Sequence, residues 1–143
     1  HKDIPLSAAM GIEVVEFAND RLVVRAPLAP NINVHGTAFA GSLYAIAALC
    51  GWGMTWLQLK VRHINGSIVI ADGHIHYAAP VQQGIVAMCR FDGADLDTAM
   101  ARLTGTDKTR FKLDCTIDAH GSEAAHFTGD YAVRLHQAPV NEG

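Results

Sequence analysis

The feature that most constrains the fold is a long apolar stretch in the first half of the chain, NINVHGTAFAGSLYAIAALCGWGMTWLQL, residues 31–59. No charged residue occurs between Arg25 and Lys60. The pattern predicts one helix over residues 37–59, about 30 Å long at a rise of about 1.5 Å per residue. A helix that is apolar nearly all round is buried, either in a protein core or in a membrane.

The context of this segment favours a protein core. The segment contains four glycines and several polar residues, and the rest of the chain has strand-like alternation with no second candidate span. Its many alanines and glycines would let strands approach the helix backbone closely. Although the length alone would suffice for a membrane span, we expect a central helix wrapped by a sheet, and no membrane partner.

Strand-like runs flank the predicted helix on both sides. Residues 12–18 and 21–27 are joined by a two-residue turn, which predicts a hairpin. Four further strands are expected after the helix, over residues 67–80, 84–91, 109–120 and 124–135. Short helices are expected at residues 6–10 and within 92–108, the second capped by Asp95 or Asp97 and ended by Gly105. The tail, residues 138–143, is expected to fray.

This order of elements predicts the fold. Two strands, a long helix and four more strands indicate a single α+β domain over residues 1–143, with an antiparallel sheet wrapped around a long central helix. The hot-dog fold is the leading architecture of this kind.

The composition of the chain indicates which classes of binding partner are unsuited to it and in which cellular compartment we expect it. The formal net charge of −3 gives no general attraction for nucleic acid or anionic membranes. Cys50, Cys89 and Cys115 are widely spaced and form no CxxC motif, which is typical of buried, reduced thiols. With no secretory signal evident, we expect a cytoplasmic protein.

A family resemblance rests on N-x-N-x-H-G-T-x-F-x-G-S-L-Y at residues 31–44 and on GWG-x-x-W at residues 51–56. These motifs resemble the thioesterase family that occurs as the C-terminal domain of YiiD-type acetyltransferases and as stand-alone proteins. The resemblance implies a hot-dog fold and a homodimer with a sheet continuous across two subunits, or a dimer of dimers. It also implies action on an acyl thioester of CoA or of acyl-carrier protein, without a cofactor.

A wider likeness to hot-dog acyl-CoA thioesterases implies a role for Gly36. Those enzymes carry a His-Gly-Gly motif where this chain has His35-Gly36-Thr37, and the first glycine's N–H, at the helix N-terminus, polarises the thioester carbonyl. Free amides and the positive end of a helix do stabilise an oxyanion. The chain departs from the pattern at Tyr44, where several of those enzymes carry a catalytic carboxylate. No carboxylate occurs between Asp20 and Asp72.

Each residue of the predicted loop has a chemical and a structural interpretation. His35 is a candidate general base, or a histidine that binds loop backbone. Asn33 and Asn31 position a water on the carbonyl or hold the approach to the helix. Thr37 is an N-cap or faces the thioester.

Three candidate site residues outside the loop are supported by weaker sequence motifs. Tyr44 binds substrate or water, or packs in the core with its hydroxyl satisfied. Ser42 is a candidate for substrate binding, because no GxSxG elbow supports a nucleophile. Asp72 is a candidate for substrate binding or a displaced base.

Two further groups of residues have an interpretation as ligand sites. Asp72, His74 and His76 alternate on one strand face and could ligate a metal. We predict no metal, because in the resembled fold the face with Gly73, Ile75 and Tyr77 suits the helix and leaves the histidines outward or at a subunit contact. Four basic residues could neutralise CoA phosphates or form a solvated face: Lys60, Arg62, Arg110 and Lys112.

The leading hypothesis is therefore hydrolysis of an acyl thioester, with Gly36, His35, Asn33, Thr37 and Tyr44 as catalytic residues. The first alternative is an acyl-thioester-binding module without turnover, supported by the missing helix carboxylate. A hydratase and a metal protein are further alternatives.

Overall fold

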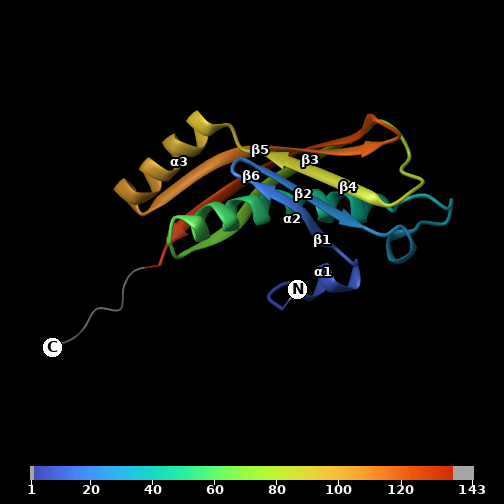
Figure 1. Cartoon of the computed structure of the whole chain (residues 1–143), viewed down its shortest axis with the longest axis horizontal. Helices are drawn as coiled ribbons and strands as arrows, with labels where there is room; N and C mark the ends of the chain where they lie inside the picture. The colour runs from blue at the N-terminus through green and yellow to red at the C-terminus, as the bar shows by residue number, and fades with distance from the viewer. Residues whose placement is uncertain (1, 137–143) are drawn as a thin grey trace.

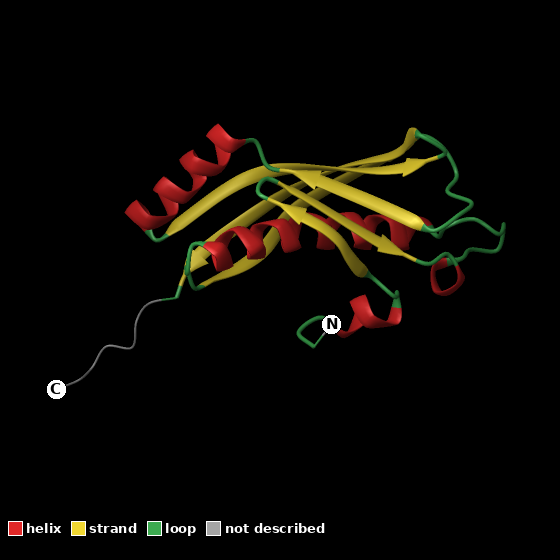
Figure 2. Ribbon diagram, viewed as in Figure 1, coloured by secondary structure: helices red, strands yellow, loops and turns green. Residues whose placement is uncertain are grey.

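The protein is a curved antiparallel sheet that wraps around one long helix (Figures 1 and 2). This computed structural model describes residues 2–136. The helices are α1 (Pro5–Ala9), α2 (Ala40–Val61) and α3 (Gly93–Thr106), with a short 3-10 helix at Ala29–Asn31. The strands are β1 (Glu13–Ala18), β2 (Arg21–Ala26), β3 (Gly66–Tyr77), β4 (Ile85–Arg90), β5 (Lys108–Ala119) and β6 (Ser122–Leu135). The sheet order is β1-β2-β4-β5-β6-β3, so β1 and β3 are the edges.

The central helix lies on the inner face of the sheet, as predicted. Its buried side includes Ile46, Cys50 and Met54, none of which is exposed to solvent. Where α2 crosses β6, the Tyr131 hydroxyl donates a hydrogen bond to Ala48 O at 2.8 Å. A Cβ at Gly51 would lie only 2.2 Å from that hydroxyl. Glycine is therefore required at this crossing. By length and composition α2 could also cross a membrane, but here its apolar side covers the sheet.

The strands alternate as the sequence predicts. On β5, Leu113, Cys115 and Ile117 are buried against α2, while Asp114 lies on the outer face.

The three cysteines are free and buried, and Cys89 is the register partner of Cys115. Burial raises the pKa of the Cys89 thiol. A hydrogen bond with Cys50, followed by burial, raises the pKa of Cys115. The thiols of Cys89 and Cys115 are thus held in the protonated form.

Several helix boundaries differ from those predicted from the sequence. The central helix begins at Ala40 instead of residue 37 and ends at Val61. The cap of α3 is Asp92, whose side chain accepts hydrogen bonds from Ala94 N and Asp95 N. The prediction of a cap at Asp95 or Asp97 is wrong because Asp92 follows the preceding strand closely enough to cap the helix one turn earlier. Gly105 does not end α3, since Asp107 takes the left-handed conformation instead. The predicted frayed tail, residues 138–143, lies outside the described residues.

Candidate active site at the N-terminus of the central helix

The N-terminus of α2 presents unpaired backbone donors. Phe39 is the N-cap and makes no side-chain capping bond. The amides of Ala40, Gly41 and Ser42 have no acceptor within residues 2–136. The first amides of an α-helix have no intrahelical partner, and the helix dipole makes this end positive. This end of α2 is therefore suited to an oxygen that carries negative charge.

The loop before the helix is held by Asn33. Its Oδ1 accepts from the amides of His35 at 2.8 Å and Thr37 at 3.2 Å. Its Nδ2 donates to Thr37 Oγ1 at 2.8 Å and to Ala38 O at 3.3 Å. With its side chain fully engaged, Asn33 organises the loop that presents His35. The predicted role for Asn33 in positioning water would need this amide to leave its partners.

Gly36 and Thr37 do not lie where the sequence suggested. Gly36 is four residues before the first residue of α2, in a turn where its φ is +76°. Its N–H donates to Asn33 O at 3.1 Å. The prediction that Gly36 lies at the N-terminus of the helix is therefore wrong. The interpretation of Thr37 as the N-cap is also wrong, because Phe39 takes that position. The long-range bonds from Ala38 N to Val81 O and from Phe39 N to Asn31 O keep this segment extended and delay the helix.

A small hollow of about 330 Å³ opens beside the amides of α2. Its other wall is the end of β3 and the segment that follows it. Tyr77 lines it and donates its hydroxyl to Ala40 O at 2.8 Å. Burial, and next the nearby Tyr44 hydroxyl, raise the pKa of Tyr77 above its usual 10.0. Tyr77 therefore stays a protonated donor. None of the residues that line this hollow is acidic. The lining residues are Asn33, Ala38, Ala40, Leu43, Tyr77, Ala78, Ala79, Pro80 and Val81.

Tyr44 lies one helical turn from the free amides, packed between α2 and β3. Its ring makes an edge contact with Phe127 at a centroid distance of 5.0 Å. A Cβ at Gly73 would lie 2.2 Å from the Tyr44 hydroxyl, so only glycine fits there. No hydrogen bond to that hydroxyl occurs in the described part of the chain. Ser42, the third helical residue, is half-buried at the same end of α2.

The structure separates Asp72 from this site. Asp72 is exposed and accepts a hydrogen bond from Gly73 N at 2.9 Å. It acts electrostatically on Arg110, which lies on the outer face of the sheet. His74 and His76 alternate with Gly73, Ile75 and Tyr77, and both histidines are exposed. Within residues 2–136, no three side chains of the His, Cys, Asp or Glu type gather closely enough to hold a metal ion.

The other predicted residues also take definite places. The His35 side chain is exposed, with no acidic partner among residues 2–136, so the pairing that a hydratase needs is not formed. Asn31 is buried and donates to Met10 O and Pro27 O, which ties the loop to the N-terminal segment.

The four predicted phosphate-binding cations already have neighbours. Lys60 lies over the Trp56 ring, and Arg62 donates to Gln58 at the far end of α2. On the sheet, Arg110 pairs with Asp130, and Lys112 lowers the pKa of the same carboxyl. These cations do not surround the amides of α2.

Comparison with known proteins identifies the family and the fold. Residues 1–135 match the family YiiD_C, described as "Putative thioesterase (yiiD_Cterm)". The chain belongs to the YiiD_C thioesterase family. A Shewanella oneidensis protein described as a "putative thioesterase" is 40% identical, with a TM-score of 0.86 and coverage of 95% of this chain and 92% of that one. A Chlorobaculum tepidum protein of unknown function is 32% identical, with a TM-score of 0.90 and coverage of 94% and 89%.

A third solved structure, from Pseudomonas aeruginosa, extends the match in fold alone. It is 18% identical, with a TM-score of 0.82 and coverage of 94% of this chain and 90% of that one. The YiiD_C domain thus has the hot-dog fold predicted from the sequence.

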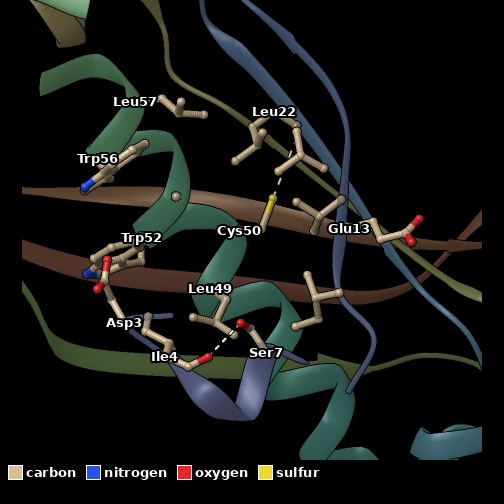
Figure 3. Close-up of a pocket in the computed structure, with 14 residues that line it drawn as sticks. Asp3, Ile4, Ser7, Glu13, Leu22, Leu49, Cys50, Trp52, Trp56 and Leu57 are labelled. Carbon is tan, nitrogen blue, oxygen red and sulfur yellow. Dashed lines mark hydrogen bonds between the residues drawn. The ribbon is translucent and has the colours of Figure 1, made fainter. Parts of the chain in front are cut away.

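A second, larger hollow of about 520 Å³ lies further along α2 in this YiiD_C domain (Figure 3). It opens between α2, β1 and the N-terminal segment, and its wall is mostly apolar. Trp52 and Trp56 stack with their ring centroids 6.5 Å apart. Leu57 points toward Leu22, and Leu49 lies beside Ile4 and Ser7 of the N-terminal segment (Figure 3). This space suits a hydrocarbon chain.

Sequence reasoning missed two parts of the site. Tyr77 was assigned to the helix-facing side of its strand, but nothing in the sequence signals that its hydroxyl reaches Ala40 O. The large hollow depends on α1 and β1 lying across α2, a long-range arrangement that the GWG-x-x-W motif alone does not specify.

Proposed function

We propose that this chain hydrolyses acyl thioesters at the N-terminus of α2. The observation that carries the proposal is the row of free amides at Ala40, Gly41 and Ser42 beside a hollow without acidic residues. When water attacks a thioester carbonyl, the oxygen gains negative charge. These amides and the helix dipole would stabilise that charge in a site that needs little reorganisation.

In this mechanism His35 is the general base. It lies in the loop that Asn33 fixes beside the helix, and an imidazole is suited to proton transfer near neutral pH. Water attacks the carbonyl carbon and passes a proton to His35. The tetrahedral intermediate then expels the thiolate, which takes the proton from His35 and leaves as a thiol. The Tyr44 hydroxyl, which has no hydrogen-bond partner within residues 2–136, is a donor one helical turn away, and the bond from the Tyr77 hydroxyl to Ala40 O holds the end of β3 against α2.

The acyl group would run along the uncovered side of α2. Leu49 is nine residues beyond Ala40, about 13 Å along the helix. An acyl chain of about ten carbons or more, bound by its carbonyl at the amides, would therefore reach the apolar hollow of Figure 3. The thiol part of the substrate is CoA or an acyl-carrier protein.

Val14 lines the apolar hollow of Figure 3 and is 64% exposed. Val14→Trp should therefore slow the hydrolysis of long-chain substrates and leave that of short-chain substrates unchanged.

A homodimer built through β3 is part of this proposal. β3 is an edge strand of 12 residues, with Val69 58% and Ile70 41% exposed. A second copy paired antiparallel along β3 would satisfy the edge hydrogen bonds and cover this apolar surface. Ile70→Lys should give a monomer by light scattering, whereas His74→Lys, exposed on the outer face of the same strand, should leave the dimer intact.

The test of catalysis removes one amide without removing the helix. Ala40 is the first helical residue, where proline is tolerated, and Phe39 already has the extended backbone that precedes proline. Thiol release from acyl-CoAs of increasing length should fall about 100-fold or more in Ala40→Pro. Ala40→Ser, which keeps the N–H, is the matched control. Equal rates in the two variants would remove these amides from the mechanism.

A second function, binding of acyl thioesters without turnover, is favoured by one observation. Tyr44 stands where related enzymes have a carboxylate, and neither the hollow nor its loop contains an acidic residue. This alternative predicts saturable acyl-CoA binding with no thiol release above the rate without protein. A 10-fold or greater loss of release in His35→Gln, with binding kept, would instead support hydrolysis.

A further inference from the structure

We propose that a basic hollow on the outer face of the sheet binds a small molecule carrying two or more phosphate groups. The hollow has a volume of about 530 Å³ and lies between α3 and the strands β5, β6 and β3. Its cationic residues come from three elements: Arg102 of α3, Lys108 and Arg110 of β5, and Arg134 of β6. No acidic residue lines it.

The arrangement of charge in this basic hollow is costly without a ligand. Lys108 and Arg134 are direct register partners across β5 and β6. Side chains in this relation are about 5 Å apart at Cβ, and like charges placed so are destabilising. Arg102 adds a third cation. None of these three forms an ion pair within residues 2–136, although the chain as a whole has a net charge of −3.

Three other arginines of the sheet pair with carboxylates. Arg110 donates two hydrogen bonds to Asp130, at 2.9 and 2.8 Å, on the same β5–β6 ladder. Arg25 bonds Glu13 and Arg21 bonds Glu16 across β1 and β2. In the basic hollow, Lys108 and Arg134 are direct cross-strand partners, and neither has such a carboxylate within residues 2–136. An anion from outside the chain would supply the missing charge.

The shape of the basic hollow fits phosphate groups. Ala132 lies between Val69 and Arg110 in register, and its small side chain leaves room above the sheet. The Ser67 side chain is exposed in the row that contains Lys108 and Arg134. Guanidinium groups bind phosphate oxygens in two-bond forks, and a lysine adds a compact charge. Three unpaired cations match a diphosphate better than a single carboxylate, which would neutralise only one of them.

This site is separate from the amides of α2. Ser67 is ten residues from Tyr77 on β3, about 33 Å along the strand, and the basic hollow lies on the opposite sheet face from α2. Figure 1 shows α3 at the end of the sheet where β5 begins. The phosphates could belong to a free phosphate ester or to the nucleotide end of a CoA molecule. The chemistry recognised is the same, and the source is left to the experiment.

The experiment measures binding by calorimetry with two probes, inorganic diphosphate and CoA, at about 0.1 M salt, where distant charges are screened. Wild-type protein should bind diphosphate saturably. The double variant Arg102→Gln/Arg134→Gln should weaken it about 10-fold or more. Ala132→Leu, which fills the floor and keeps every cation, should weaken it similarly. Lys112→Gln removes a charge from the same strand outside the hollow and should change affinity less than about 2-fold.

The CoA arm separates the two sources. If the double variant loses CoA binding as well, the nucleotide end of CoA occupies the hollow; if only diphosphate binding is lost, the ligand is a free phosphate ester. The proposal is overturned if wild-type protein shows no saturable diphosphate binding, or if Lys112→Gln weakens it as much as the double variant. Since binding is measured without turnover, this result is independent of whether the chain hydrolyses thioesters.

Discussion

The two faces of the sheet use the same strands for opposite purposes. On the inner face, side chains such as Cys115 and Tyr131 are fully buried against α2. On the outer face, Asp114 accepts a hydrogen bond from Thr128 at 2.6 Å and lies 3.2 Å from the His126 ring, in contact with water. On the inner face the available volume restricts which side chains fit, whereas on the outer face the charges of neighbouring side chains matter most. Substitutions should therefore be costly inside when they change size, and mild outside when they change charge.

The largest effect should come from overfilling the inner face. Gly51→Ala places a Cβ 2.2 Å from the Tyr131 hydroxyl and 2.5 Å from ring carbon Cζ. We expect a loss of about 3 kcal/mol in the free energy of unfolding, measured with urea. Gly105→Ala is the matched control, because nothing lies within 4 Å of a Cβ at that position of α3. It should gain up to about 1 kcal/mol through helix propensity.

A smaller effect should follow from removing the inner hydroxyl itself. Tyr131→Phe loses the 2.8 Å bond to Ala48 O and should cost about 1 kcal/mol. In the double variant with Gly51→Ala, the closest clash disappears. The combined loss should therefore be smaller than the sum of the two single losses. Strict additivity in urea titrations would mean that the two residues do not compete for the same space.

The outer face should respond to pH more than to volume. The hydrogen bond from Arg110 holds the pKa of Asp130 below its usual 3.8. The stability that this lowered pKa provides is fully present above about pH 4 and is lost as the pH falls through the lower folded value. Asp130→Asn should remove that part of the acid dependence, with an effect at neutral pH smaller than that of Tyr131→Phe. An unchanged acid profile in thermal unfolding would contradict this assignment.

The smallest effect should come from His126. Burial lowers the pKa of His126, but hydrogen bonds with Asp114 and then Glu123 outweigh it and raise the pKa above 6.5. The resulting stability is present below about pH 6.5 and is lost as the pH rises through the higher folded value. An NMR titration should give a pKa above 6.5, which falls in Asp114→Asn. A value at or below 6.5 would show that burial dominates.

The sequence predicted the fold well because its strongest signals are local. The uncharged stretch from residue 31 to residue 59 requires burial. The alternation of apolar and polar residues from Phe111 to Ile117 predicts one buried and one solvent-exposed face of that strand. The outward position of His74 and His76 was also predicted, and it depends on the β-bulge between Ile70 and Asp72. Without that irregularity the next residues would exchange faces.

The candidate site was predicted only in outline. The motif around His35 and Gly36 was placed correctly beside the central helix, but the first helical residue was misplaced. Helix propensity does not reveal the bonds that keep the loop extended, from Ala38 N to Val81 O and from Asn33 to Thr37. Those bonds transfer the proposed donor role from Gly36 to the amides that begin at Ala40.

The sequence by itself determined that a charge-free helix is buried by an antiparallel sheet, because apolar surface of that length has no other stable place in water. It also determined which sheet face is polar, since side chains alternate along a strand. Only the tertiary structure decided where the helix begins, that the Tyr77 hydroxyl bonds Ala40 O, and that Lys108 and Arg134 lie side by side and line one hollow with Arg102. Those features depend on contacts between residues far apart in the chain, whose register local propensity does not specify.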